Sequence, residues 1–549
     1  MKQSVKFLIE RGNKLFSDRM PMMTLWQSIA DQFYCERASF TMSRSDGDEF
    51  AAHLMTGLPS MIRRDLANQI SAMLRPRGKD WFEVEPADEE LAEDQIIKGW
   101  CQDKSAVMRR AMYDIHSGFI RATKTADHDF CTFGQAVITV ELDRLTNTLL
   151  YRPWHLRDVA WSENYAGMID EVHHKIKLAA RDVVKLFKNA HESVKKAAEK
   201  EPLKEIELRR IICPYEDEKG GNRFASMSYY VDVENEHELE ERPLVEHPYV
   251  IPRWQTVQSQ YAHSPATVIG LPDARTLQAM TLTLFEAGEK AVNPPLIAYQ
   301  EALRSDVNTW AGAVTYVDID YDERQGEPVR PLFTDKGGLA FGMDMLERMG
   351  DLLKEAFYLN KIMLPPVGDA MTATEVRIRT EEYVRAALPL FEPLETDYNG
   401  ALCEKTWGLL MREGAFGNLR EEMPRQLQGR EINFSFQTPL QAAQEREKAA
   451  AFQELAQLLA AGMQVDQKLV AEVDTRKAFR DAANAIVPHA EWIVPEEVSE
   501  QALEGQQQAQ QMQELAAVAG QGMGLASQGL DLAKAVGETA SAFQTTGAV

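Results

Sequence analysis

The sequence predicts an α+β fold that is mainly helical, and three observations predict it. Apolar residues recur every three or four positions along most of the 549 residues, as they do on one face of an amphipathic helix. One middle region instead alternates aromatic and β-branched residues with polar ones, which is typical of strands. The chain is also too long for one hydrophobic core, and its 44% hydrophobic content is enough for several.

The elements can be placed in order along the chain. Helices are predicted from Val5 to Asn68, with the last of them extending to about Arg75, and again over 95–131. The strand-rich region with its preceding helix reads as one α+β domain over 83–264. Its strands are predicted at 137–140, 149–151, within 155–176, and at 206–211, 224–231 and 249–254, with a Lys-rich helix over 179–200 between them, and one further strand is predicted at 432–436.

Two apolar helices around an insert are the most informative feature. They are predicted within 268–295 and 340–363. Between them, alternation over 313–321 predicts a half-buried strand, and 329–333 its return. The second helix is apolar over so wide an arc that it must be covered on more than one side. Neighbouring copies of the chain would supply that cover, so this order favours a ring that surrounds a channel.

A long third helix is predicted after the second apolar helix. Thr372 as N-cap and Glu375 three residues later form a capping box. Pro389 and Pro393 fall inside the helical pattern and predict kinks. From Gln501 onward, Gln, Ala, Gly and Met dominate, and such a segment has too little bulky apolar surface to fold alone.

Four short segments, together with the tail composition, carry a family resemblance. They are Trp26-Gln27-Ser28-Ile29-Ala30, Arg64-Asp65-Leu66-Ala67-Asn68-Gln69, Trp81-Phe82 and Met371-Thr372-Ala373-Thr374-Glu375-Val376. In this order they resemble the head-to-tail connecting (portal) proteins of short-tailed bacteriophages, over essentially the whole chain. The resemblance implies the portal fold, built of a wing, a stem, a clip and a crown. The implied parts are a wing over 1–267, stem helices over 268–295 and 340–363, a clip over 296–339, a tunnel loop over 364–371, a long kinked wing and crown helix over 372–414, a crown over 415–505, and a tail over 506–549 that can form a helical barrel.

The same resemblance implies a function and a set of partners. Twelve copies would form a ring at one capsid vertex, assembled in the host cytoplasm, through which double-stranded DNA is packaged and later ejected. The implied partners are the terminase packaging motor, a tail adaptor, and the capsid and scaffolding proteins, with no membrane and no cofactor. The net charge of −24 argues against tight sequence-independent DNA binding. It suits a conduit, because a repelling wall keeps DNA centred.

Three groups of residues follow from these assignments. The tunnel loop set, expected to face DNA, is Lys361, Pro365, Pro366, Val367, Gly368 and Asp369. The stem set, expected to form the interface between subunits, is Leu277, Leu284, Leu346, Leu352, Leu353 and Phe357. The clip set, expected to contact a partner protein, is Asp318, Asp320, Asp322, Glu323 and Arg324.

Other functions receive less support from the residues. A metal-dependent nuclease would use Asp318, Asp320 and Glu323 as ligands, but alternating acidic residues are more typical of a solvated strand face. A tail-adaptor or scaffold component is the other alternative. The sequence has no Gly-Lys-Ser/Thr phosphate loop and no Gly-x-Ser-x-Gly elbow. Without these motifs, no enzyme is expected. The five cysteines lack metal-ligand spacing, so no metal site is expected either.

Overall fold

The computed structural model describes most of the chain up to residue 436. The described residues are 4–436, without 46, 79, 89–90, 92–93, 144–145, 216–225, 258, 300–302, 309, 311, 319–326, 328, 333–337, 363–393 and 419–422, together with 452–459 and 478–479. The chain separates into two compact units. The first comprises Met1–Leu91 and Trp100–Gln441, and the second comprises Ala92–Gly99 and Ala442–Val549. In the second unit, the described residues 452–459 are helical, as their three Leu and two Gln favour.

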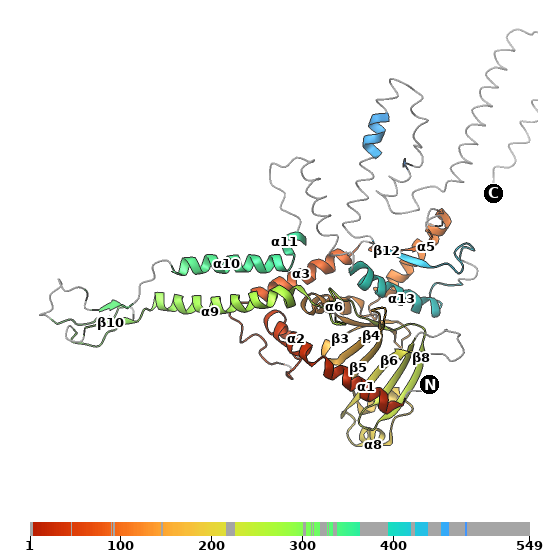
Figure 1. Cartoon of the computed structure of the whole chain (residues 1–549), viewed down its shortest axis with the longest axis horizontal. Coiled ribbons are helices and arrows are strands. Elements are labelled where there is room, and N and C mark those ends of the chain that lie inside the picture. The colour runs from red at the N-terminus through yellow and green to blue at the C-terminus, as the bar shows by residue number, and fades with distance from the viewer. Residues whose placement is uncertain are drawn as a thin grey trace, which may run out of the picture. The chain divides into compact units, whose positions relative to one another are not determined.

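The N-terminal helices form where the sequence predicts them. Ser4 caps the first helix by accepting a hydrogen bond from the backbone N–H of Phe7 (3.3 Å). The second and third helices each carry a proline in the first turn, where its missing N–H costs nothing. Gly134, at a φ of 78°, ends the helix Phe119–Phe133. These helices are α1 (Val5–Asp18), α2 (Met20–Phe33), α3 (Leu58–Leu74), α5 (Gln95–Met112) and α6 (Phe119–Phe133) (Figure 1).

Two antiparallel sheets make up the strand-rich region, in the orders β4-β5-β6-β7-β8 and β3-β2-β9 (Figure 1). All the strands predicted in this region are confirmed, and the α+β fold class with them. The predicted Lys-rich helix is two helices, α7 (Ala180–Leu186) and α8 (Glu192–Lys200). The strands are β2 (Val137–Leu142), β3 (Leu149–Trp154), β4 (Val159–Glu163), β5 (Ile169–Ala179), β6 (Glu205–Pro214), β7 (Ser226–Asp232), β8 (His237–Leu244) and β9 (Tyr249–Val250).

Both faces of the five-stranded sheet are covered by helices. On β6, Leu208 packs in a cluster with α7 and α8, which includes Val183 and Val194. Ile211, three positions later and therefore on the opposite face, packs with Leu8 of α1. The core of this region is thus three layers thick, with α1 on one side and α7 and α8 on the other.

A two-stranded sheet joins distant parts of the chain. Strand β1 (Phe82–Pro86) pairs with β12 (Ile432–Phe436), so that Val84 lies opposite Phe434. Nearby, Trp407 of α13 (Ala401–Arg412) packs against the Trp100 ring at 6.4 Å. Of the crown expected over 415–505, the described residues 415–418 and 423–436 lie in the first unit, where β12 pairs with β1. The boundaries of the crown stay a prediction. Strand β1, the partner of β12, is not among the strands predicted from the sequence.

A buried ion pair lies at the centre of the first unit. Arg75, at the end of α3, donates to the Asp127 carboxylate of α6 and to Asn399 Oδ1 (2.7 Å). Tyr398 donates to the same carboxylate (2.9 Å) from a π-helical turn, Glu395–Gly400. Burial alone would lower the pKa of Arg75, but the charge of Asp127 outweighs it and raises that pKa. The network therefore holds the start of α13 against α3 and α6.

Buried histidines make the stability of the fold depend on pH. Burial, reinforced by Arg37, lowers the pKa of His155 to about 3, and burial near Arg210 lowers that of His174 to about 3. In the unfolded chain both titrate near 6.5. Between these values only the unfolded state binds the proton, so acidification favours unfolding, by about 1.4 kcal/mol per pH unit for each histidine.

We therefore expect stability to fall as the pH drops from 7 to 5. Denaturant unfolding at several pH values measures this slope. His174→Gln is expected to make the slope shallower, whereas His116→Asn, at an exposed position, should leave it unchanged. Equal slopes in the wild type and His174→Gln would contradict the assignment.

Candidate functional site

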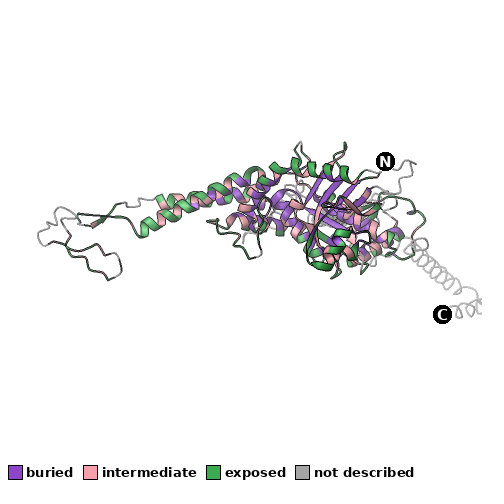
Figure 2. Cartoon of the chain, turned by 90° about the horizontal axis from the view of Figure 1, so that it is seen from below, coloured by how far each residue is buried: buried purple, intermediate pink, exposed green. Residues whose placement is uncertain are grey.

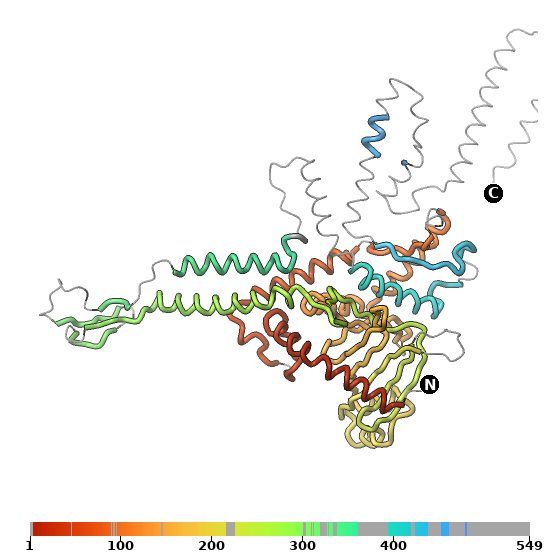
Figure 3. Tube along the Cα trace, viewed as in Figure 1, coloured from red at the N-terminus to blue at the C-terminus, as the bar shows by residue number. Residues whose placement is uncertain are grey.

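Two long helices run side by side away from the sheets (Figures 1 and 3). They are α9 (Leu271–Val292) and α10 (Gly338–Ala356), which confirms the two predicted apolar helices. The helices touch most closely at Gly342, where an added Cβ would overlap the Leu284 side chain. Gly342 thus permits a tight contact that makes the pair, here called the hairpin, one packed unit.

The hairpin is buried near the sheets and exposed along the rest of its length (Figure 2). Phe285 is 60% exposed and Phe341 69% exposed, although both are large and apolar. A contiguous exposed surface of this kind marks an interaction site in a soluble protein. Its apolar residues are Leu282, Phe285 and Val292 of α9, and Phe341, Met343, Met345 and Leu352 of α10.

The insert between the two helices begins and ends as a short antiparallel pair. Strand β10 (Leu296–Ala298) pairs with β11 (Val329–Pro331), which confirms the predicted return strand. The strand predicted over 313–321 is wrong for its described part, 313–318, where only an isolated bridge joins Val317 to Leu303. Tyr316 is 65% exposed. Val314 and Val317 are exposed as well, so the described residues place no second layer over these apolar side chains.

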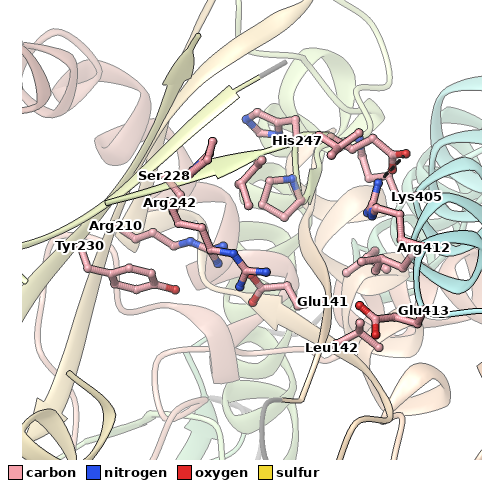
Figure 4. Close-up of a pocket in the computed structure, with 17 residues that line it drawn as sticks. Glu141, Leu142, Arg210, Ser228, Tyr230, Arg242, His247, Lys405, Arg412 and Glu413 are labelled. Carbon is pink, nitrogen blue, oxygen red and sulfur yellow. Dashed lines mark hydrogen bonds and ion pairs between the residues drawn. The ribbon is translucent and has the colours of Figure 1, made fainter. Parts of the chain in front are cut away.

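A polar cavity of about 310 Å³ lies between the large sheet and α13 (Figure 4). On one wall, Arg210 pairs with Glu141. On the other wall, Arg412 pairs with Glu246 (3.1 Å), whose carboxylate lies directly against Gly408 of α13. Burial lowers the pKa of Lys405 in this wall, while Glu404 and Glu246 oppose the shift. The Arg412–Glu246 pair fastens the loop after β8 to α13, and the Arg210–Glu141 pair joins β6 to β2. The residues that line the cavity present no nucleophile–base arrangement.

The contact between Glu246 and Gly408 leads to a testable prediction. A methyl group at residue 408 would collide with the Glu246 carboxylate. That carboxylate is the free end of a flexible side chain and can turn away, but doing so breaks its pair with Arg412. Gly408→Ala is therefore expected to change the stability by less than about 1 kcal/mol, because the lost pair offsets alanine's better helix propensity. Thermal or denaturant unfolding measures this change.

The matched control is Gly99→Ala, because Gly99 lies inside α5 with no described atom within 4 Å of its added Cβ. That variant should be stabilised by up to about 1 kcal/mol. Stabilisation of both variants would show that Glu246 moves aside freely.

Comparison with protein families agrees with this layout. A sequence model of the family described as bacteriophage head to tail connecting protein matches residues 6–491. This match spans most of the 549 residues. The chain belongs to this family.

Individual relatives support the same family assignment. The chain is 23% identical over 453 residues to a protein named probable portal protein from Bordetella phage BPP-1, with 80% of each chain covered. It is 20% identical over 452 residues to the portal protein of Salmonella phage epsilon15, covering 80% of this chain and 79% of that one. A chain from the virion of a native gene transfer agent particle aligns at 11% identity with a TM-score of 0.37, covering 78% of this chain and 94% of that one.

The structure divides the predicted stem set into two groups. Leu284 and Leu346 are half-buried and Leu352 is 53% exposed, so each of these three side chains keeps apolar surface that a second subunit would bury. Leu277, Leu353 and Phe357 are at most 1% exposed, because they pack inside the connecting protein itself. No second copy of the chain is present, so the stem set stays a prediction, and within one chain Leu277, Leu353 and Phe357 are already covered. Phe285, Phe341 and Met343 are exposed apolar residues on the same two helices.

The other two sets are only partly covered by the described residues. Lys361 lies in the short helix α11 (Leu359–Ile362). Asp318 forms an ion pair with Arg304 (3.0 Å). The remaining members lie outside the described residues: Pro365, Pro366, Val367, Gly368 and Asp369 of the tunnel loop set, and Asp320, Asp322, Glu323 and Arg324 of the clip set.

Among the described residues, no group of three or more His, Cys, Asp or Glu is placed to hold a metal ion. None of the described helices has the length and hydropathy needed to cross a bilayer. His173 bonds to Glu171 (2.9 Å) and His174 to Tyr249 (2.9 Å), on opposite faces of β5 as the strand pattern predicts.

Proposed function

We propose that copies of this chain form a ring, of about twelve subunits, at one vertex of a phage capsid. The hairpins would line up around the ring as the stem, with the insert over 296–339 as the clip at one end. Double-stranded DNA would pass through the central channel during packaging and ejection. The chain would act as a structural part of the virion, assembled in the host cytoplasm, and not as an enzyme.

The observation that carries the proposal is the exposed apolar surface of the hairpin. Leaving Phe285, Phe341 and Leu352 in water is unfavourable by about 1–3 kcal/mol for each side chain. A neighbour packed on both sides of the hairpin would remove that cost. A closed ring supplies such neighbours to every subunit, because each subunit uses the same pair of surfaces.

The partners follow from the two ends of such a ring. The terminase motor would dock on the clip during packaging, and a tail adaptor would dock there afterwards. Capsid and scaffolding proteins would hold the ring in the shell. The net charge of −24 supports a channel without sequence-specific DNA contacts, in which repulsion limits friction.

Electron microscopy of the purified protein, combined with its mass in solution, tests the ring. Rings with a central hole and a mass near twelve times 62.0 kDa are the expected result. A monomer or dimer that persists when scaffolding protein is added would overturn the proposal.

The tunnel loop can be tested separately. Replacing Pro365, Pro366, Val367 and Gly368 with a Gly/Ser linker is expected to impair DNA packaging or retention while rings still form, because glycine and serine cannot keep a stiff loop in place. The readout is packaged DNA per particle. As a control, the same linker replaces the exposed turn 164–167 between β4 and β5. Unimpaired packaging in the first variant would contradict the loop assignment.

The nuclease alternative gains nothing from the described residues. Asp318 forms an ion pair with Arg304, and the guanidinium would compete with a metal ion for the Asp318 carboxylate. We expect no divalent-metal-dependent DNA cleavage by the purified protein. Cleavage that is lost in Asp318→Ala would reverse this conclusion.

A further inference from the structure

The contacts of the hairpin with one segment show which flanks of α9 and α10 lie together. On α9, the side-chain amide of Gln278 accepts from the backbone N–H of Thr56 (2.9 Å) and donates to the Thr56 carbonyl (2.8 Å). On α10, a Cβ added to Gly350 would lie 3.1 Å from Leu58 Cδ2. Because Thr56 and Leu58 are only two residues apart, Gln278 and Gly350 lie on one flank of the hairpin. This flank is called the near face, and the opposite flank is called the far face.

The members of each face follow from the helical repeat. Residues separated by three or four positions lie on the same side of a helix, so each face can be counted along α9 and α10. Toward the insert, from Leu282 on α9 and up to Arg348 on α10, every member of both faces is exposed (Figure 2). The near face comprises Gln278, Leu282, Phe285, Glu289 and Val292 of α9, and Met343, Glu347, Gly350 and Lys354 of α10. The far face comprises Thr276, Ala279, Thr283, Glu286 and Lys290 of α9, and Phe341, Met345, Arg348 and Leu352 of α10.

The two faces of α9 differ in the size of their apolar side chains. On the near face, the Phe285 ring stands out into water. The far face carries the small residues Thr276, Ala279 and Thr283 at the same part of the helix. The Thr276 and Thr283 hydroxyls donate to the carbonyls of Pro272 and Ala279 on their own helix (both 3.0 Å), so their hydrogen bonding is already satisfied. The far face of α9 is thus a shallow surface that can receive a bulky apolar side chain.

Opposite charges on consecutive residues also distinguish the two faces. On α9, Glu289 belongs to the near face and Lys290 to the far face, and on α10 the same holds for Glu347 and Arg348. None of these four side chains forms an ion pair with a described residue. Consecutive residues of a helix differ in height by only about 1.5 Å. The far face also carries Glu286, which is three residues from Glu289 and therefore not at its height.

We propose that the near face of one hairpin packs on the far face of the hairpin in the next subunit. This inference rests on the ring proposed above. Rotation about the axis of a ring keeps every residue at its own height, so Glu289 of one subunit meets Lys290 of the next, and Phe285 lies over Thr283 there. On α10, Glu347 meets Arg348 in the same way.

A second copy of the chain fits these faces because each face carries what the other one needs. A contact between two different faces is heterologous, and repeated by rotation it closes into a ring. A contact between two near faces would instead end at a dimer. It would also place Glu289 against Glu289 and Phe285 against Phe285, with no base opposite the acid. Charge and side-chain size therefore both favour the head-to-tail order.

Charge reversals test this contact in the full-length protein. Glu289→Lys and Lys290→Glu each place like charges opposite one another in every subunit contact. Each is therefore expected to raise the protein concentration needed for assembly about fivefold. The double variant Glu289→Lys with Lys290→Glu restores opposite charges and should assemble like the wild type. Mass in solution over a range of protein concentrations measures assembly, and about 1 M salt should reduce the defect of both single variants.

The matched controls are Glu199→Lys and Lys200→Glu, which change the net charge by the same amounts at exposed, consecutive positions of α8. They should leave assembly unchanged. Equal assembly of the wild type and both single variants, or a double variant as defective as the single ones, would overturn the head-to-tail contact while the ring itself stands. A wild type that forms no rings would remove the function proposed above, and this contact with it.

Disulfide trapping tests the order of the faces without relying on charge. Thr283→Cys combined with Phe285→Cys places one thiol on each face at nearly the same height, so a mild oxidant should link assembled subunits into a ladder of covalent multimers on a non-reducing gel. The five native cysteines are buried and should not react. Each single variant should stay without cross-links. Covalent dimers from Phe285→Cys alone would overturn the proposal, because two near faces would then meet, and so would rings of the double variant that give no ladder.

Discussion

Replacing Leu353 with aspartate is expected to unfold the base of the hairpin, whereas the same change at Leu352 should leave the subunit folded and stop its assembly. Leu353 is 0% exposed and Leu352 is 53% exposed, although the two are neighbours on α10. Aspartate at residue 353 would bury an unpaired carboxylate and remove a packed side chain, at a cost of roughly 4 kcal/mol or more. Aspartate at residue 352 would cost the isolated subunit little, but would put a charge into the proposed interface.

Two measurements separate these effects. Denaturant unfolding reports the stability of the subunit, and mass in solution reports assembly. Glu355→Ala, at an exposed position on the same helix, is the control for both. If Leu352→Asp still forms rings, the exposed face of α10 does not contact another subunit. If Leu353→Asp is as stable as the wild type, the hairpin does not pack on the rest of the chain as described.

Asp127→Asn is expected to be the most destabilising single change that keeps the volume of a side chain. It leaves the Arg75 guanidinium buried without its counter-charge, which typically costs about 3–5 kcal/mol. It also weakens the hydrogen bond donated by Tyr398, so the start of α13 should loosen with it. Guanidinium chloride unfolding at neutral pH measures the loss.

The matched control is Asp65→Asn. Asp65 and Arg64 form an exposed pair 3.9 Å apart, and removing such a pair should change stability by less than about 1 kcal/mol. The double variant Arg75→Met with Asp127→Leu removes both buried charges and should recover part of the loss. A change below 1 kcal/mol in Asp127→Asn alone would mean that water reaches the Arg75 guanidinium.

Local periodicity predicted most of the elements because their pattern is set by neighbours in sequence. The β-branched run of β2 and the helical spacing of α9 and α10 are of this kind. Strand β8 was missed, because His237, Glu238, Glu240 and Glu241 make it charged, as edge strands often are. The strand expected over 313–321 is not formed in its described part, 313–318, where alternating apolar residues such as Val314 and Tyr316 stay exposed and no described layer packs on them.

The candidate site was harder to predict than the fold. Helical spacing identified the apolar faces of the hairpin, but it does not say which residues are covered inside the subunit. Leu353 and Phe357 are fully buried, with Phe357 packed on Phe33 of α2, whereas Phe285 and Phe341 are 60% and 69% exposed, and both groups look alike in the sequence.

The pairing of β1 with β12 has a consequence for biosynthesis. Val84 can pair with Phe434 only after about 350 further residues have been synthesised. At ribosomal speed that delay is roughly 20 to 70 s. Throughout it, an unpaired apolar edge beside Trp81 and Phe82 is open to other nascent chains, which is a known route to aggregation. The yield of soluble subunits should therefore depend on chaperones and on slow expression more than on the stability of the finished fold.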